Sequence, residues 1–165
     1  MQMNLTFVTN EDSSLTTNQK PRKVTENGRE YLVVPLTSIV PGVLNGSQGP
    51  LFYPPEETSK DVGQWNSVPL VVYHPTDSLG RPVSAKHPGV IKSSGIGVAR
   101  ETTYNGKLQH EGWFDLAKTK LVDKRVYNAL IKGQKLELST GLYTRNEPAP
   151  DGSVYNGRPY THMLS

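Results

Sequence analysis

The alternation of apolar and polar residues is clearest from Lys135 to Tyr143, KLELSTGLY. Successive side chains of a β-strand point to opposite faces of the sheet. Leucines take one face of this predicted strand and polar or aromatic residues the other: Leu136, Leu138 and Leu142 oppose Glu137, Ser139 and Tyr143. We therefore expect a strand that holds Ser139 on a rigid element, pointing away from the apolar side.

Runs rich in β-branched and aromatic residues predict further strands. These are Tyr31–Val40, where Pro35 indicates an edge or a bulge, Val68–Tyr73, Gly95–Thr103 and Lys107–Asp115. The last two segments flank Asn105-Gly106. Because both of these residues tolerate positive φ, they predict a β-hairpin.

One long amphipathic helix is predicted in the basic segment KLVDKRVYNALIKGQ, where Val122, Val126 and Leu130 recur every four residues. Gly133 is a natural stop for this helix. A short helix is expected in Pro55–Gln64, since proline suits a first turn and acidic residues follow it. Val43–Tyr53 and Asp77–Pro88 are interpreted as long loops, and Tyr155–Arg158 as a small hairpin.

Short strands with turn signals and a single long helix predict a β-rich α+β fold. We expect a mostly antiparallel β-barrel or strongly curved sheet with a few surrounding helices. Residues 1–27 are predicted to form a flexible N-terminal arm, because Thr9–Asn27 has few large apolar side chains. Residues 28–165 form the remaining domain, and the chain stops at Ser165 without a clear terminator, which suggests a truncated or processed end.

Composition narrows the class of protein. The 165 residues include 15 glycines and 13 prolines, as expected for one turn-rich β domain. The absence of cysteine excludes disulfides and cysteine-ligated metals. A polar N-terminus and the lack of an apolar run of ~20 residues lead us to expect a soluble, intracellular protein with no membrane partner.

The net charge is +3, and we interpret the basic segment from Lys118 to Lys135 as a solvated helix face, so nucleic acid is an unlikely partner.

Two residues carry the chemistry that the pattern indicates. Ser139 is the candidate nucleophile, and His74, which ends the apolar strand VPLVVYHP just before a proline, is the candidate base. A hydroxyl becomes a good nucleophile only when a neighbouring base takes its proton, and histidine titrates near neutral pH. A structural serine and a turn histidine are the alternative interpretation, and His87 in KHPG is the main rival for the role of base. The sequence contains no HExxH motif, Walker A motif, dinucleotide fingerprint or EF-hand loop, so we expect no metal and no cofactor.

The order of these motifs resembles that of the tailed-phage prohead maturation proteases, serine peptidases with a herpesvirus-protease-like fold. In that family a histidine closes an early strand, a glutamate lies in a hairpin strand of the form "xxEGxx", and a helix precedes a serine in "LS-small-G". The corresponding residues are His74, Glu111 and Ser139. The opening GREYLVVPLTSIVPGVLNG is similar to that of a phage subgroup, and the resemblance covers about Gly28 to Glu147.

The resemblance implies a serine endopeptidase of capsid maturation. It would cleave scaffold and major capsid protein segments inside the assembling prohead, in the host cytoplasm, and trim itself, with possible self-association. Glu111 would orient the histidine, although His110 and His162 stay open for this third role, since herpesvirus proteases use a second histidine. The alternative is a catalytically inactive capsid- or scaffold-binding domain of the same fold.

Overall fold

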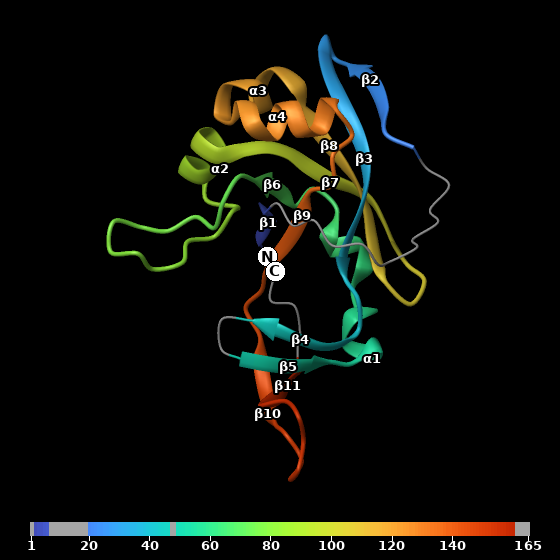
Figure 1. Ribbon diagram of the computed structural model, residues 1–165, viewed down its shortest axis with the longest axis vertical. Coiled ribbons are helices and arrows are strands. Elements are labelled where there is room, and N and C mark those ends of the chain that lie inside the picture. Colours follow the sequence, from blue (N-terminus) through green and yellow to red (C-terminus); the bar gives the residue numbers. More distant parts are fainter. Residues whose placement is uncertain (1, 7–19, 47–48, 161–165) are drawn as a thin grey trace.

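Two β-sheets and a few short helices make up the protein in the computed structural model, which describes residues 2–6, 20–46 and 49–160 (Figure 1). Seven strands form the larger sheet, in the order β2-β3-β8-β7-β6-β1-β9, and four form the smaller one, in the order β10-β11-β5-β4. Both sheets are mostly antiparallel, with β1–β6 and β11–β5 as the parallel pairs. The predicted β-rich α+β class is therefore confirmed.

The strands of the larger sheet are β1 Gln2–Thr6, β2 Arg22–Glu26, β3 Arg29–Ile39, β6 Pro69–Val71, β7 Gly95–Tyr104, β8 Leu108–Asp115 and β9 Glu137–Gly141. Those of the smaller sheet are β4 Gly42–Gly46, β5 Gly49–Tyr53, β10 Arg145–Pro148 and β11 Gly157–Tyr160. The helices are α1 Pro55–Thr58, a 3-10 turn at Val62–Trp65, α2 Pro88–Ser94, α3 Leu116–Val122 and α4 Lys124–Ile131.

The main core lies between the larger sheet and the helices α3 and α4. Figure 1 shows this helix pair over one end of the larger sheet, with the smaller sheet at the opposite end of the molecule. Ten buried side chains form the centre of this core: Leu32, Val68, Leu70, Val72, Ile96, Ala99, Phe114, Leu116, Val126 and Leu130. They come from four strands, from the segments flanking β6 and from both helices, so burial of this surface ties the sheet to the helix pair.

The larger sheet is curved but does not close into a barrel. β9 comes close to β3 across the inner face. Among the described residues, however, no ladder of hydrogen bonds joins the end strands β2 and β9. The prediction of a strongly curved sheet therefore holds, and that of a closed barrel is wrong.

Four of the predicted strand regions match the structure closely. The ends of β3 and β6 differ by at most two residues from those of the predicted strands Tyr31–Val40 and Val68–Tyr73. β7 and β8 form the hairpin predicted at Asn105-Gly106. Gly106 has φ +81°, the left-handed conformation that glycine adopts most readily. β9 carries Ser139, with Leu138 packed against the main core, as the alternation predicts.

Three segments differ from the sequence interpretation. Val43–Tyr53, expected to be a loop, contains the strands β4 and β5, which pair with each other. Two segments of the predicted N-terminal arm are strands: β1 lies inside the larger sheet and β2 at its edge, while the rest of the arm up to residue 19 lies outside the described residues. The small hairpin predicted near the end of the chain is present as the antiparallel pair β10 and β11, but its connection lies between Pro148 and Gly157 and not at Tyr155–Arg158.

The long helix predicted before β9 is broken in two at Asp123. This residue has φ −152° and ψ 111°, which are extended values, and its carboxylate accepts hydrogen bonds from the backbone N–H groups of Arg125 and Val126. Aspartate is a favoured N-cap because it satisfies the free N–H groups of a helix start. Val126 and Leu130 still reach the core, and Gly133 ends the second helix with φ +63°.

Candidate active site

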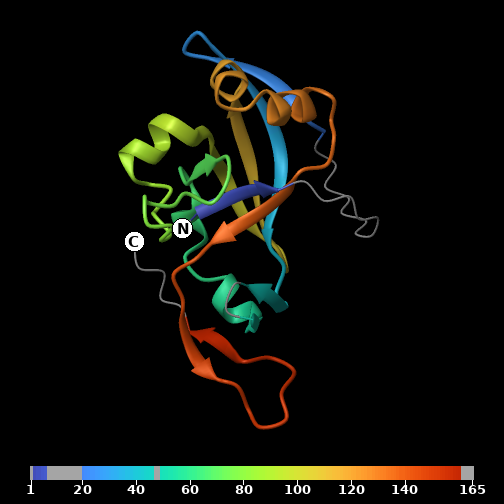
Figure 2. The ribbon, with the colours of Figure 1, turned by 60° about the vertical axis from the view of Figure 1, so that its left-hand side comes forward.

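Ser139 lies on β9, an end strand of the larger sheet, two positions away from β6. The backbone of Asn4 in β1 pairs with Ser139 on one side and with Val71 of β6 on the other. Figure 2 shows β1 and β9 side by side. The Ser139 side chain is half-buried and lies on the face of β9 opposite Leu138, which contacts the core. The serine is therefore on a rigid element and partly accessible, as expected of a nucleophile.

His74 is exposed and follows the last residue of β6, Val71, by three positions. β6 runs parallel to β1, and β9 runs antiparallel to it. The end of β6 that leads to His74 therefore lies on the side where β9 begins. Two strand spacings of about 4.8 Å separate the backbones of Val71 and Ser139, and His74 lies three residues beyond Val71. The strand that leads to the predicted base and the strand that carries the predicted nucleophile are therefore two positions apart in the same sheet.

The structure does not bring Glu111 to His74. Leu70 pairs with Gly97, and Gly97 pairs with Phe114, so Glu111 is level with the residues before β6, whereas His74 lies beyond its far end. At about 3.3 Å per residue, the offset along the strands is roughly 20 Å. The predicted contact between the glutamate and the base is therefore absent.

The Glu111 carboxylate instead makes contacts on the outer face of the larger sheet. Arg22 Nη2 lies 2.8 Å from Oε1 and 2.9 Å from Oε2, and Trp113 Nε1 donates to Oε2 at 3.1 Å. Trp113 also lies under the guanidinium of Arg100 (4.2 Å from the ring centroid). These contacts join β2, β7 and β8 and give Glu111 a structural role.

His110 lies on the inner face of β8, as its shared parity with Leu108 and Phe114 predicts. Its Nε2 is 2.6 Å from the Ser38 hydroxyl, and its Nδ1 is 2.9 Å from the Thr102 hydroxyl. Both hydroxyls come from irregular stretches of the adjacent strands, where the registers of β3 and β7 against β8 shift. β-Bulges of this kind re-aim a side chain.

Both hydroxyls that contact His110 have a second acceptor within reach. The Thr102 hydroxyl is placed to donate to Asn66 Oδ1 at 2.8 Å, and the Ser38 hydroxyl to Leu108 O at 3.3 Å. A neutral His110 ring donates from one nitrogen and accepts at the other, so it can satisfy one hydroxyl as donor and the other as acceptor. Burial lowers the pKa of His110 to about 4, which keeps the ring neutral. With 3% of its surface exposed, His110 is a structural histidine and a poor candidate for the third catalytic role.

The structure gives no support to His87 or His162 as the general base. His87 is the N-cap of α2, where its Nδ1 accepts a hydrogen bond from Gly89 N at 3.1 Å. His162 lies outside the described residues. His74 therefore stays the prediction for the general base.

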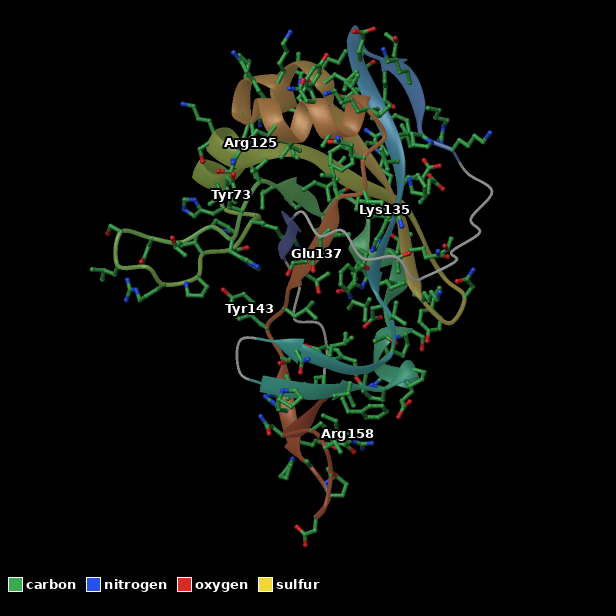
Figure 3. All side chains as sticks on the ribbon, in the orientation of Figure 1. Tyr73, Arg125, Lys135, Glu137, Tyr143 and Arg158 are labelled. Atoms are coloured by element: carbon green, nitrogen blue, oxygen red, sulfur yellow. The ribbon has the colours of Figure 1, made fainter. Side chains whose placement is uncertain are left out.

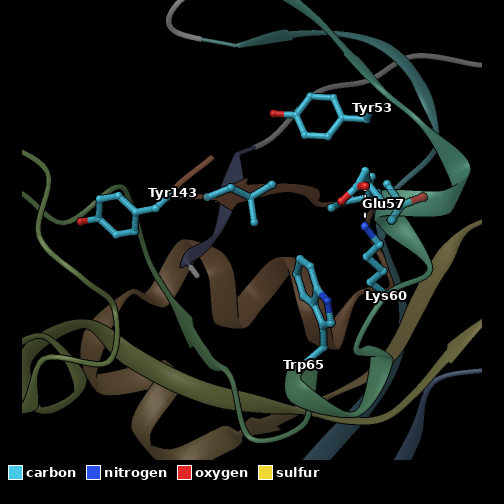
Figure 4. A pocket seen from close by; sticks show the side chains of 8 residues that line it. Tyr53, Glu57, Lys60, Trp65 and Tyr143 are labelled. Atoms are coloured by element: carbon cyan, nitrogen blue, oxygen red, sulfur yellow. Dashed lines mark hydrogen bonds and ion pairs between the residues drawn. The ribbon is translucent and has the colours of Figure 1, made fainter. Parts of the chain in front are cut away.

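A small cavity lies beside the end of β9, between the two sheets (Figure 4). Leu142, which follows β9, and Trp65 of the 3-10 turn contribute apolar walls, and the cavity encloses about 30 Å³. Lys60 Nζ and Glu57 Oε1 form an ion pair of 2.5 Å on its rim. Burial raises the pKa of Tyr53, which faces the same space. Sequence reasoning missed this cavity, because its walls come from three segments that are distant along the chain.

Comparison of the chain with family models, with curated proteins and with solved structures gave no match. Within the described ranges, no three histidine or acidic side chains converge in a way that could hold a metal ion. None of the helices in the same part of the chain has the length and apolar character needed to cross a bilayer.

Proposed function

We propose that the protein is a serine endopeptidase in which Ser139 is the nucleophile and His74 the general base. The observation that carries this proposal is the β9–β1–β6 register, in which Asn4 pairs with both Ser139 and Val71. This register supports a common site for the serine and for the loop that begins with His74. In enzymes without bound substrate, catalytic hydrogen bonds are often long, and they tighten only when the substrate binds.

The proposed reaction is acyl transfer. The Ser139 oxygen forms a bond to the carbonyl carbon of the scissile peptide while the His74 imidazole takes the hydroxyl proton. The imidazolium then returns that proton to the leaving amine as the C–N bond breaks, which leaves an acyl-enzyme. Water, deprotonated by the same imidazole, releases the acid product and regenerates Ser139. Glu111 is not part of this machinery, because its carboxylate is held by Arg22 and Trp113.

The substrate class follows from the resemblance to prohead maturation proteases. We propose that the protein has a herpesvirus-protease-like fold and cleaves scaffold and major capsid protein segments inside an assembling phage prohead, in the host cytoplasm. It also trims itself in this proposal. The cavity beside Leu142 offers an apolar surface for a substrate side chain next to the strand that bears Ser139.

Incubation of the chain with its own capsid and scaffold proteins tests this function. Wild type should produce discrete fragments, and both Ser139→Ala and His74→Ala should abolish them. The double variant should be no worse than either single variant, since nucleophile and base act as a unit. Full cleavage by Ser139→Ala would show that the nucleophile is another residue.

One observation favours a second function, an inactive capsid- or scaffold-binding domain of the same fold. The third carboxylate that the resemblance supplies, Glu111, is engaged elsewhere. If this second function is correct, the wild-type protein and Ser139→Ala should bind the capsid or scaffold protein equally well, and neither should cleave it.

A further inference from the structure

The residue immediately before His74 has a strained backbone. Tyr73 has φ +66°, in the left-handed region that a side chain with a Cβ rarely adopts. Val72, on its other side, is buried in the main core. The chain therefore leaves the core at Tyr73, and the φ of this residue sets the direction in which His74 projects. Strain of this kind persists only when surrounding contacts hold it, and it concentrates at functional sites.

The contacts that hold Tyr73 come from the junction of the two helices. Tyr73 is 57% exposed. Its hydroxyl nevertheless lies 3.1 Å from Asp123 Oδ2 and also accepts a hydrogen bond from Arg125 Nη2. The Arg125 guanidinium is 6.0 Å from the centroid of the Tyr73 ring. Figure 3 shows Tyr73 and Arg125 next to each other at this side of the molecule, although they are about 50 positions apart along the chain.

The helix junction is a firm anchor for this hydroxyl. Asp123 caps α4 and also accepts from the Arg125 side chain, with Nη2 at 2.9 Å from Oδ2 and Nε at 3.3 Å from Oδ1. The hydrogen bond from Arg125 is the main reason that the pKa of Asp123 falls to about 2, so its charge is constant at neutral pH. Val126, in the first turn of α4, is 2% exposed and packs into the core.

We propose that Tyr73, Asp123 and Arg125, the Tyr73 clamp, are positioning residues that aim His74 at Ser139. This inference rests on the proposed function, in which His74 is the general base. The clamp itself takes no proton from substrate. It keeps Tyr73 in the left-handed conformation, and without it the backbone can relax to an extended one, which turns the imidazole away from the serine.

Reaction of Ser139 with a fluorophosphonate probe tests the clamp through the rate of labelling. Tyr73→Phe removes only the hydroxyl, and we expect it to lower the labelling rate on the order of tenfold, since small misplacements of catalytic groups have large effects on rate. Tyr155→Phe, beside the smaller sheet, is the matched control and should label at the wild-type rate. Labelling of Tyr73→Phe at the wild-type rate, or an equal loss in Tyr155→Phe, would overturn the proposal.

A second measurement decides on the clamp even if wild type is not labelled at all, which is the result that would refute the proposed function. The ring carbon-proton NMR signal of His74 is identified by its loss in His74→Gln. It should shift or broaden in Tyr73→Phe and stay unchanged in Tyr155→Phe. An identical His74 signal in wild type and Tyr73→Phe would show that the clamp does not position the imidazole.

Discussion

At the scale of single residues, His110 has the clearest physical consequence. An unfolded histidine binds a proton near its ordinary pKa of 6.5, whereas the buried ring binds one only near pH 4. Between these values the unfolded chain holds more protons than the folded one, so folding stability decreases as the pH falls. Protonation also turns the ring nitrogen that accepts a hydrogen bond from Ser38 or Thr102 into a donor, so that hydrogen bond must rearrange.

We therefore predict that the free energy of unfolding decreases by about 3 kcal/mol between pH 7 and pH 4 through His110 alone, at up to ~1.4 kcal/mol per pH unit. Urea unfolding at pH 7, 6 and 5 measures this. The pH range over which His110 affects stability lies above the range over which Asp123 does. The pKa of Asp123 is about 2, so its titration affects stability only below about pH 4. His110→Gln should flatten the pH dependence, and an unchanged slope in this variant would contradict the prediction.

Sequence reasoning reached part of the residue-scale description. Period-two alternation along β8 puts His110 on the same face as Leu108 and Phe114 and Glu111 on the other, and this is local information that the sequence alone contains. It could not show that Glu111 pairs with Arg22, a residue 89 positions away in a segment that had been interpreted as a flexible arm. Nor could it detect the clamp on Tyr73, since left-handed backbone in a tyrosine has no sequence signal.

At the scale of elements, the sequence correctly predicted turns and helix ends where a single residue or dipeptide determines the backbone conformation. Asn105-Gly106 predicted the β7–β8 hairpin, and Gly133 predicted the end of α4. The β4–β5 hairpin was missed because glycine and proline between Val43 and Tyr53 were interpreted as strand breakers. In the structure Gly49 begins β5 with φ +93°, a conformation that only glycine adopts easily. The helix break at Asp123 was missed because the apolar spacing continues unbroken through it.

The close approach of β7 and β8 at Gly97 gives an element-scale prediction. A Cβ on this residue would clash with the backbone oxygen of Trp113 and would lie 3.0 Å from Phe114 Cα. We expect Gly97→Ala to lower the free energy of unfolding by about 1–3 kcal/mol, because both contacts are with backbone that cannot move aside. Gly63→Ala, where a Cβ meets nothing within 4 Å, is the matched control for urea unfolding. Equal midpoints for the two variants would show that the strands separate easily at this point.

At the scale of the whole molecule, three chain crossings connect the two sheets within the described residues. β3 leads into β4, β5 leads through α1 and the 3-10 turn into β6, and β9 leads into β10. The residues that line the cavity come from these three crossings. The predicted fold class could be reached from the sequence because strand number and turn signals are summed over many residues. The closure of the sheet could not be predicted from the sequence, because it depends on whether the distant strands β2 and β9 pair with each other. In the described residues they do not pair.

The central claim is that Ser139 is an activated nucleophile that depends on His74. Mass spectrometry of the intact protein and of its peptides after fluorophosphonate treatment tests this directly. We predict a single adduct on Ser139, lost in Ser139→Ala and in His74→Ala. It should be retained in folded Glu111→Gln, because the glutamate is bonded to Arg22 and lies roughly 20 Å from His74 along the strands. An unlabelled wild-type protein, an adduct on another serine, or labelling that survives His74→Ala would contradict the account.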